Sequence, residues 1–154
     1  MNKLYLAYGS NLNVEQMHRR CPTARIVGYT YLPDTRLIFR GSSSGFYLSI
    51  EPEPGASVPC GVFRIFDRDE RQLDIYEGYP RFYRKVFFDD LPLYDVRGEE
   101  TQRIYAMAYA LNRSAPAGFP STAYWKICMQ GYRDFGFNIA DLQEAMYNTM
   151  EELK

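Results

Sequence analysis

Two short segments of this sequence carry residue types that can perform acid/base chemistry without a metal. Residues 8–11 (YGSN) follow an apolar run and precede a helix start, where successive backbone N–H groups can converge on an anionic oxygen. Glu77 stands at the predicted end of a helix among aromatic residues, and both the negative helix end and an apolar neighbourhood disfavour its ionisation. Such a carboxylate can take up and return a proton near neutral pH.

Each segment also fits an ordinary structural role. Asn and Ser satisfy local backbone groups in many turns, and a glutamate at a helix end is usually solvated. The residue types alone therefore leave a catalytic and a structural interpretation open for both segments.

Other catalytic machinery has little support. His18 is the only histidine and stands beside Arg19 and Arg20 in a predicted helix, which favours a surface position over a catalytic triad. Cys21, Cys60 and Cys128 with this one histidine form no recognised zinc pattern. Gly9 lacks the further glycines and the lysine of phosphate-binding loops. We therefore expect no metal and no cofactor.

The composition is typical of one globular unit. The chain has 154 residues, 46% of them hydrophobic, which is enough for one core, so we expect a single domain over residues 1–154. Its 18 basic and 19 acidic residues provide no extended positive field, so nucleic acid is not an expected partner. Without an export signal or a membrane segment, and with three separated cysteines, we expect a cytoplasmic location and no membrane partner. The oligomeric state, including a homodimer, stays open.

The elements that must position these residues follow from local patterns. β-rich runs predict strands at 4–8, 26–32, 36–39, 46–50, 61–66, 83–88 and 103–111. Capping residues predict helix starts at Asn13, Asp67, Ser121 and Asn138, and Gly78 closes the second helix just after Glu77. Small residues alternate along 104–110, as in a tightly curved sheet. We predict an α+β fold, a small mixed and mostly antiparallel β-barrel with flanking helices.

Three segments together resemble the γ-glutamylcyclotransferase family, including its AIG2-like members. They are residues 5–12 (YLAYGSNL), residues 73–78 (LDIYEG) and residues 120–131 (PSTAYWKICMQG), so the resemblance spans nearly the whole chain. The last segment is similar to members that act on γ-glutamyl amino acids. Residues 77–84 (EGYPRFYR) are more similar to the branch associated with γ-glutamylamines.

This resemblance implies a γ-glutamylcyclotransferase-like fold and a small-molecule γ-glutamyl substrate. The implied reaction is a cofactor-free cyclisation to 5-oxoproline that releases an amino acid or an amine. Glu77 stands at the family's catalytic acid/base, which carries a proton from the attacking amine to the leaving amine. The residues expected to bind the substrate are Tyr5, Leu6, Ala7, Tyr8, Gly9, Ser10, Asn11, Tyr83 and Tyr124. Tyr124 also fits an ordinary aromatic position of an amphipathic helix.

Two alternatives to this enzyme remain. A binding or regulatory protein could keep the γ-glutamyl pocket without turnover, because one fold can host unrelated functions. A thiol enzyme is the weaker alternative, since the one histidine has no evident partnership with a cysteine. For the enzyme, we expect leaving-group selectivity to come from loops at 40–45 and 113–120.

Overall fold

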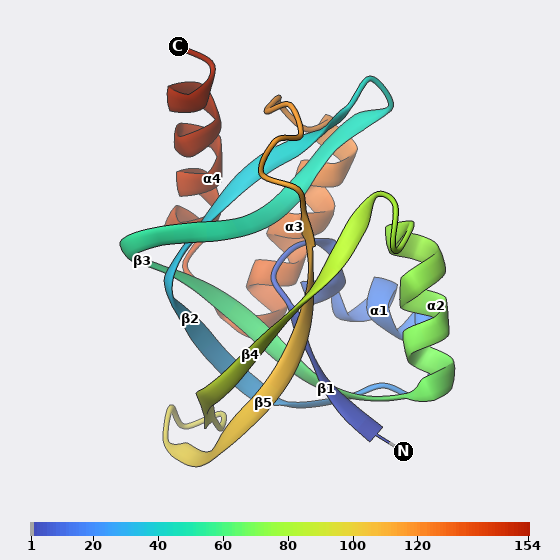
Figure 1. Cartoon of the computed structure of the whole chain (residues 1–154). Helices are drawn as coiled ribbons and strands as arrows, with labels where there is room; N and C mark the ends of the chain where they lie inside the picture. Colours follow the sequence, from blue (N-terminus) through green and yellow to red (C-terminus); the bar gives the residue numbers. More distant parts are fainter. Residues whose placement is uncertain (1) are drawn as a thin grey trace.

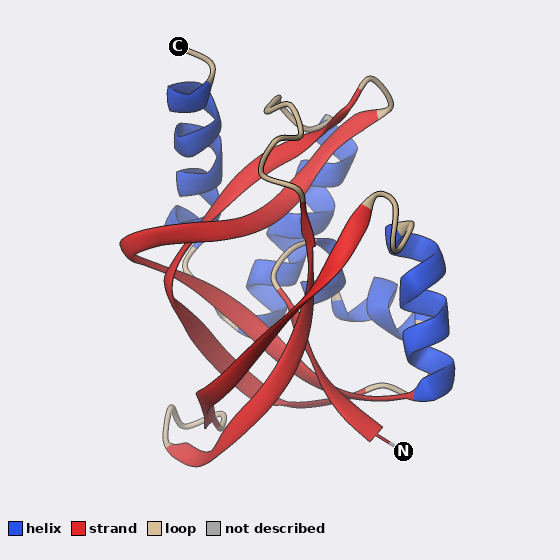
Figure 2. Ribbon diagram, viewed as in Figure 1, coloured by secondary structure: helices blue, strands red, loops and turns tan. Residues whose placement is uncertain are grey.

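The computed structural model describes residues 2–154, in which five strands close into a barrel with helices packed outside it (Figures 1 and 2). The strands are β1 (Asn2–Ala7), β2 (Arg25–Ser42), β3 (Gly45–Phe66), β4 (Tyr83–Tyr94) and β5 (Glu100–Leu111). Their order around the barrel is β1-β3-β2-β4-β5. The β1–β5 contact that closes the barrel is parallel, and the other neighbouring pairs are antiparallel. The predicted α+β class with a mixed, mostly antiparallel barrel is confirmed.

The helices begin mostly where capping residues predict. They are the short 3₁₀ helix η1 (Ser10–Leu12) and the α-helices α1 (Val14–Arg20), α2 (Asp67–Glu77), α3 (Thr122–Phe135) and α4 (Ile139–Glu152). The side chains of Asn13, Ser121 and Asn138 each accept a hydrogen bond from a first-turn amide of the following helix. None of the helices described in residues 2–154 is both long and apolar enough to cross a membrane.

The N-cap of α2 is Phe66, one position before the predicted Asp67. The side chain of Asp69 closes the helix start, because its Oδ2 accepts a hydrogen bond from the Phe66 amide at 2.9 Å. At the other end, Gly78 adopts the left-handed conformation with φ 65°, which suits a residue without a Cβ. Glu77 is therefore the last residue of α2, as the sequence predicts.

The strands β2 and β3 are longer than the sequence pattern predicts. The prediction of separate strands at 26–32 and 36–39 is wrong, because β2 runs through both ranges. The prediction of separate strands at 46–50 and 61–66 is wrong in the same way, because β3 runs through both. The breaks are bulges: Pro33 pairs with Ser57, whereas Thr35 pairs with Pro52. The Gly55 amide donates to Asp34 Oδ1 at 2.9 Å across the bulge. A bulge bends a strand without ending its pairing, so local breakers do not stop the sheet.

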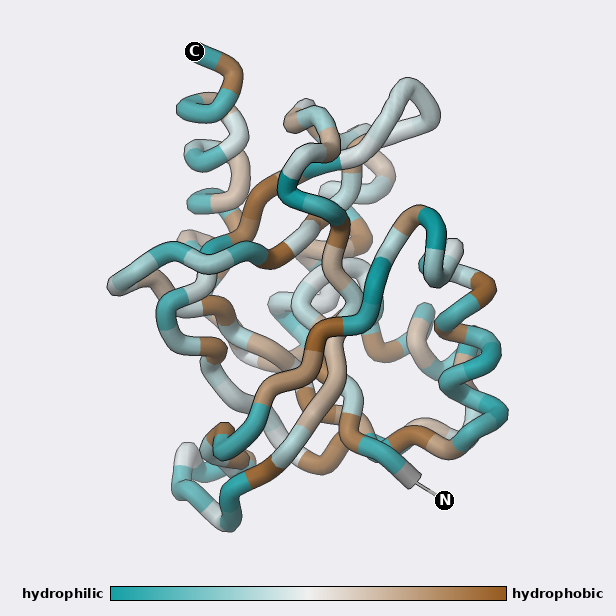
Figure 3. Tube along the Cα trace, in the orientation of Figure 1, coloured by the Kyte–Doolittle hydropathy of each residue, from teal (hydrophilic) through white to brown (hydrophobic). Residues whose placement is uncertain are grey.

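Apolar side chains from the strands and the helices form one continuous core. Figure 3 shows hydrophobic residues recurring along the strands and hydrophilic residues between them. Leu6, Ile38, Val62 and Ile65 of the barrel and Leu142 of α4 are fully buried. Helix α4 is attached to β2 through Thr149, whose Oγ1 accepts a hydrogen bond from the Phe39 amide at 3.1 Å. The helices thereby complete the core on one side of the barrel.

Polar contacts attach α2 to the barrel. Lys85 of β4 forms ion pairs with Glu70 at 2.8 Å and with Asp74 at 3.1 Å. Lys3 of β1 also pairs with Glu70, at 2.6 Å. The Tyr109 hydroxyl of β5 donates to Asp74 at 2.6 Å. Because Asp74 lies one turn before the end of α2, these contacts locate the last turn of the helix.

Candidate active site

The segment from Tyr8 to Asn11 leaves β1 and turns directly into η1. The Leu12 amide donates to Gly9 O at 3.0 Å, and the Asn13 amide donates to Ser10 O at 3.1 Å. The first N–H groups of a helix have no acceptor within the helix itself. This turn therefore has the backbone geometry of a site that can donate hydrogen bonds to an anionic group.

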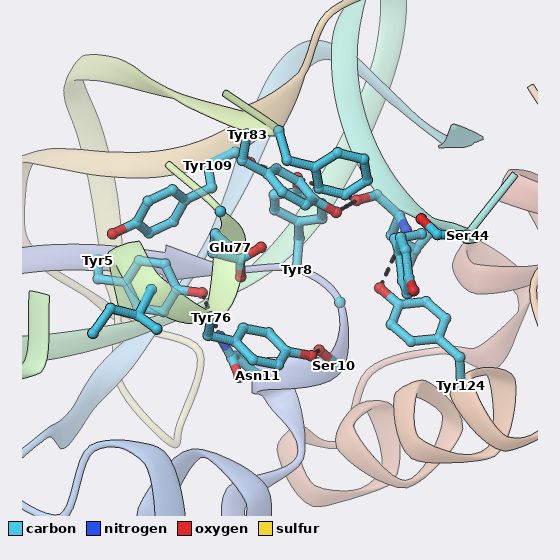
Figure 4. A pocket seen from close by; sticks show the side chains of 16 residues that line it. Tyr5, Tyr8, Ser10, Asn11, Ser44, Tyr76, Glu77, Tyr83, Tyr109 and Tyr124 are labelled. Atoms are coloured by element: carbon cyan, nitrogen blue, oxygen red, sulfur yellow. Dashed lines mark hydrogen bonds between the residues drawn. The ribbon is translucent and has the colours of Figure 1, made fainter. Parts of the chain in front are cut away.

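A cavity of about 380 Å³ lies between this turn and the end of α2 (Figure 4). Its walls come from β1, the turn, α2, the β2–β3 hairpin, β4, β5 and α3. Aromatic side chains dominate the lining, and Glu77 is its one carboxylate among the described residues. The lining residues are Tyr5, Tyr8, Gly9, Ser10, Asn11, Ser44, Tyr47, Leu48, Ile75, Tyr76, Glu77, Gly78, Phe82, Tyr83, Tyr109 and Tyr124.

Glu77 lies between aromatic side chains in this cavity, and its carboxyl group faces the side from which the turn approaches (Figure 4). The side chain keeps some accessible surface because it borders the cavity, but protein atoms surround it closely. Burial raises the pKa of Glu77 to about 7, and the positive charge of Arg20 acts in the opposite direction. Within residues 2–154, no protein group donates a hydrogen bond to this carboxylate, so it is available to a bound molecule.

Three tyrosine hydroxyls in the cavity are tied to backbone atoms. Tyr83 donates to Leu48 O at 2.9 Å, Tyr8 donates to Tyr109 O at 2.5 Å, and the Leu48 amide donates to the Tyr124 oxygen at 3.2 Å. Burial raises the pKa of all three phenols well above the ordinary value, with a further contribution from the negative charge of Glu77. These hydroxyls therefore stay protonated and shape the cavity, and Glu77 is left as its proton acceptor.

A polar network joins the turn to the last turn of α2. Asn11 Nδ2 donates to the Tyr5 hydroxyl at 3.0 Å, and Arg20 of α1 donates to Asn11 Oδ1. The Arg20 guanidinium carbon lies 3.3 Å from the centre of the Tyr76 ring, and the Tyr76 and Ser10 hydroxyls are 3.3 Å apart. Arg20 thus contacts both the turn and the residue that precedes Glu77.

Most of the residues expected at the site do surround one cavity. Together with Glu77 they are Tyr5, Tyr8, Gly9, Ser10, Asn11, Tyr83 and Tyr124. Leu6 and Ala7 do not line the cavity; they are 0% and 1% exposed in the core. Both lie in the part of β1 that pairs with Val62 and Gly61 of β3, inside the packed barrel.

The cavity is also lined by residues that were not among the expected site residues: Tyr47, Leu48, Ile75, Tyr76, Gly78, Phe82 and Tyr109. Tyr76 and Phe82 are close to Glu77 in the sequence, and this closeness could have predicted that they line the cavity. Tyr47, Leu48 and Tyr109 reach the cavity only because the barrel brings distant strands together.

Of the two loops expected to determine leaving-group selectivity, only one reaches the cavity. The hairpin end of 40–45 does contribute, through the exposed Ser44. The loop at 113–120 supplies none of the described lining residues, which corrects that expectation. It packs along β2 instead, where Gly41 donates to Pro116 O at 3.0 Å and Arg40 donates to Ala115 O at 2.9 Å. The carbonyl groups of this loop therefore accept hydrogen bonds from β2, and the loop lies outside the cavity lining.

The cysteines do not form a thiol site. Cys21, Cys60 and Cys128 are buried and are not among the described residues that line the cavity. Burial raises the pKa of Cys21 and Cys128 to about 12 and that of Cys60 further, so the thiolate form is suppressed. His18 is exposed on α1. Within residues 2–154, no three His, Cys, Asp or Glu side chains gather in a group that could hold a metal ion.

Known proteins resemble this chain in sequence and in structure. Residues 5–126 match the family described as gamma-glutamyl cyclotransferase, AIG2-like. The chain is 31% identical over 151 residues to gamma-glutamylcyclotransferase of Homo sapiens, which covers 93% of this chain and 76% of that protein. A solved gamma-glutamyl cyclotransferase structure superposes with a TM-score of 0.77 at 25% identity, over 95% of this chain and 87% of the other. The human uncharacterized protein loc79017 gives a TM-score of 0.76 at 26% identity, over 94% and 86%.

Proposed function

Because this chain belongs to the gamma-glutamyl cyclotransferase, AIG2-like family, we propose that it cyclises the γ-glutamyl group of a γ-glutamyl amino acid or γ-glutamylamine. The products are 5-oxoproline and the free amino acid or amine. The observation that carries the proposal is the position of Glu77, which lines the same cavity as the Tyr8–Asn11 turn and has its pKa raised to about 7. A carboxylate with this pKa can both accept and return a proton near neutral pH.

In the first step, Glu77 accepts a proton from the α-ammonium group of the substrate. The freed amine attacks the γ-carbonyl carbon, which forms the carbon–nitrogen bond of the five-membered ring and places a negative charge on the carbonyl oxygen. Backbone N–H groups of the turn at Gly9, Ser10 and Asn11 donate hydrogen bonds to the charged groups of the bound γ-glutamyl unit, including this oxygen.

In the second step, the bond between the γ-carbon and the leaving nitrogen breaks. The oxyanion re-forms the carbonyl as Glu77 delivers its proton to the leaving nitrogen. Glu77 then accepts the remaining extra proton from the ring nitrogen and passes it to the freed amine, which leaves as an ammonium ion, so that Glu77 ends the cycle unprotonated. Nucleophile and electrophile belong to one molecule, so the main task of the protein is orientation. The protonated tyrosines Tyr8, Tyr83 and Tyr124, held by backbone contacts, provide the rigid walls for that task.

The test is to incubate the purified protein with γ-glutamyl-alanine, γ-glutamyl-ε-lysine and glutathione, and to measure released 5-oxoproline by chromatography. We expect product from at least one of them. If none gives product but 5-oxoproline raises the melting temperature, the binding or regulatory alternative is favoured and the proposed activity fails.

The role of Glu77 has a separate test. Glu77→Gln keeps the shape of the side chain and removes the proton acceptor, so we expect kcat to fall by roughly 10²–10⁴-fold while the protein stays folded. Glu53→Gln, at an exposed position of β3, is the matched control and should have no effect. Turnover of Glu77→Gln close to that of the unmodified protein would remove Glu77 from the mechanism.

A further inference from the structure

One side of the cavity is built from four aromatic rings that contact one another. We call Tyr47, Phe82, Tyr83 and Tyr124 the aromatic wall. The ring centres of Tyr47 and Phe82 are 6.0 Å apart, those of Tyr47 and Tyr124 are 5.2 Å apart, and those of Phe82 and Tyr83 are 5.3 Å apart. All three pairs meet edge to face, at 85°, 84° and 79°. This is a favourable geometry for aromatic pairs, so the rings hold one another in place.

The aromatic wall has apolar surface that the fold itself does not cover. Tyr47, Phe82 and Tyr124 are half-buried, and all three line the cavity. Figure 4 shows Tyr124 and Ser44 on one side of Glu77 and Tyr5 on the other. Ser44 is exposed, so the cavity meets solvent on the side of the wall. A γ-glutamyl head held between the turn and Glu77 would direct its leaving group along this wall.

Charge is scarce around the same space. Glu77 is the only charged side chain among the described residues that line the cavity. Two cations that contact rings of the lining are already engaged: Arg20 binds Asn11 and stacks on Tyr76, and Lys85, 6.0 Å from the centre of the Tyr109 ring, pairs with Glu70 and Asp74. A carboxylate on the leaving group would therefore lose water without gaining a cation, and Glu77 would repel it.

We propose that the aromatic wall is the leaving-group subsite and that it selects γ-glutamyl compounds whose leaving amine has an apolar, preferably aromatic, side chain and no ionised carboxylate. This inference rests on the proposed cyclisation. The rings supply the contacts that hold such a side chain, and the uncharged lining disfavours an anionic one.

Three matched substrates separate the two parts of the proposal. γ-Glutamyl-phenethylamine has the ring and no second carboxylate, γ-glutamyl-phenylalanine has both, and γ-glutamyl-ethylamine has neither. We expect kcat/KM for phenethylamine release to exceed that for ethylamine release by about 10-fold or more, which is the usual scale of discrimination by an apolar pocket. We expect it to exceed that for phenylalanine release by about 10-fold as well, because burying an unpaired charge is costly.

Variants of Tyr47 test whether the aromatic wall causes this substrate preference. Tyr47→Ala removes the ring that contacts both Phe82 and Tyr124, so the preference for phenethylamine over ethylamine should fall to about 2-fold or less, the loss of an apolar contact. Tyr47→Phe keeps the ring and should keep the preference. Phe87→Ala is the control, since Phe87 is exposed on β4 and stacks on Tyr105 outside the cavity.

The outcomes are distinguishable. If the unmodified protein releases 5-oxoproline from none of the three compounds but does so from γ-glutamyl-alanine, γ-glutamyl-ε-lysine or glutathione, the subsite alone is overturned. If it releases 5-oxoproline from none of these six compounds, the proposed cyclisation fails and the subsite fails with it. If product forms but phenylalanine is released as efficiently as phenethylamine, or ethylamine as efficiently as either, the subsite alone is overturned. The ranking by the unmodified protein decides this even where Tyr47→Ala does not fold.

Discussion

At the scale of single residues, the properties of Glu77 come from its surroundings. It ends α2, where the helix carries partial negative charge, and it borders a cavity lined by tyrosines. Burial raises the pKa of Glu77 to about 7, whereas the positive charge of Arg20 lowers it. The same desolvation that suits a proton carrier makes the charged form unfavourable for the fold, so Glu77 should influence both activity and stability.

If Glu77 is the base of the proposed cyclisation, the pH dependence of that reaction should report the pKa of Glu77. The base must be unprotonated to start the reaction, so kcat/KM should fall as the pH drops below about 7. The measurement is a pH profile of 5-oxoproline release, with Glu53→Gln as a control that keeps the same profile. An acid limb near 4.5, the ordinary value for glutamate, would contradict the assignment.

Stability should depend on Glu77 in the same pH range. Its pKa rises from 4.5 to about 7 on folding, so its favourable contribution is present below 4.5 and is lost as the pH rises through about 7. Above that range the charged carboxylate lowers the free energy of unfolding by on the order of 3 kcal/mol. Glu77→Gln should therefore gain stability relative to the unmodified protein between pH 5 and pH 8, as measured by urea unfolding. An equal difference at both pH values would argue against a buried, titrating Glu77.

At the scale of elements, the site depends on how α1, α2 and α3 meet the turn. Arg20 of α1 binds Asn11 in the turn and stacks on Tyr76 of α2, so one side chain contacts both parts of the site. Helix α3 approaches the turn through Gly131, where a Cβ would lie 2.6 Å from the Asn13 amide nitrogen. The position of the turn beside the cavity therefore depends on how α1, α2 and α3 pack against it.

Arg20→Gln should separate the electrostatic and positioning roles of Arg20. Removing its positive charge should move the acid limb of the pH profile to a higher pH, because Arg20 lowers the pKa of Glu77. Arg20→Lys keeps the charge but loses the planar stacking group, so it should keep the pH profile and lower kcat. Arg19→Gln, at an exposed position on the same helix, is the control. A role limited to folding would leave the profile of Arg20→Gln unchanged.

Gly131→Ala should push α3 away from η1 and so destabilise the protein. The added Cβ would meet backbone atoms of Leu12 and Asn13 at 2.6–2.7 Å, and neither can move without shifting η1. We expect a loss of about 1–3 kcal/mol in unfolding free energy, the usual cost of overpacking, together with reduced turnover. Urea unfolding and 5-oxoproline release are the measurements. Lys126→Ala, at an exposed position of α3, should stay within about 0.5 kcal/mol. Unchanged stability of Gly131→Ala would disprove the tight contact.

At the scale of the whole molecule, a buried ion pair between two barrel strands also contacts the C-terminal helix. Arg40 of β2 is 2% exposed and pairs with Glu51 of β3 at 2.9 Å, and it also contacts Glu152 of α4 at 3.4 Å. Burial raises the pKa of Glu51, but hydrogen bonds and charge from Arg40 and Arg36 outweigh it, so the pKa is lowered overall. Glu51 therefore stays ionised, and Arg40 keeps its partner, across the neutral range.

Glu51→Gln should destabilise the whole fold. It leaves the buried charge of Arg40 without its main partner, which typically costs about 3–5 kcal/mol. The measurement is the free energy of unfolding in urea at pH 7. Glu53→Gln, two residues along the same strand and exposed, provides the comparison and should change little. A small effect of Glu51→Gln would mean that Glu152 or water can replace the lost partner.

The sequence by itself determined the features that depend on neighbours within one helical turn or along one strand. The helix starts at Asn13, Ser121 and Asn138 and the end of α2 at Gly78 follow from local hydrogen bonding and backbone conformation. The mixed barrel and the location of Glu77 beside the same cavity as the turn were also predictable, the latter through the resemblance of motifs.

Only the tertiary structure decided which side chains surround Glu77 and which apparent loops continue a strand. Bulges keep β2 and β3 paired through Pro33 and Pro52, and closure of the barrel brings Tyr47 and Tyr109 to the cavity. It also left Leu6 and Ala7 in the core. The physical reason is that strand pairing and burial depend on residues far apart in the chain, whose proximity no local pattern encodes.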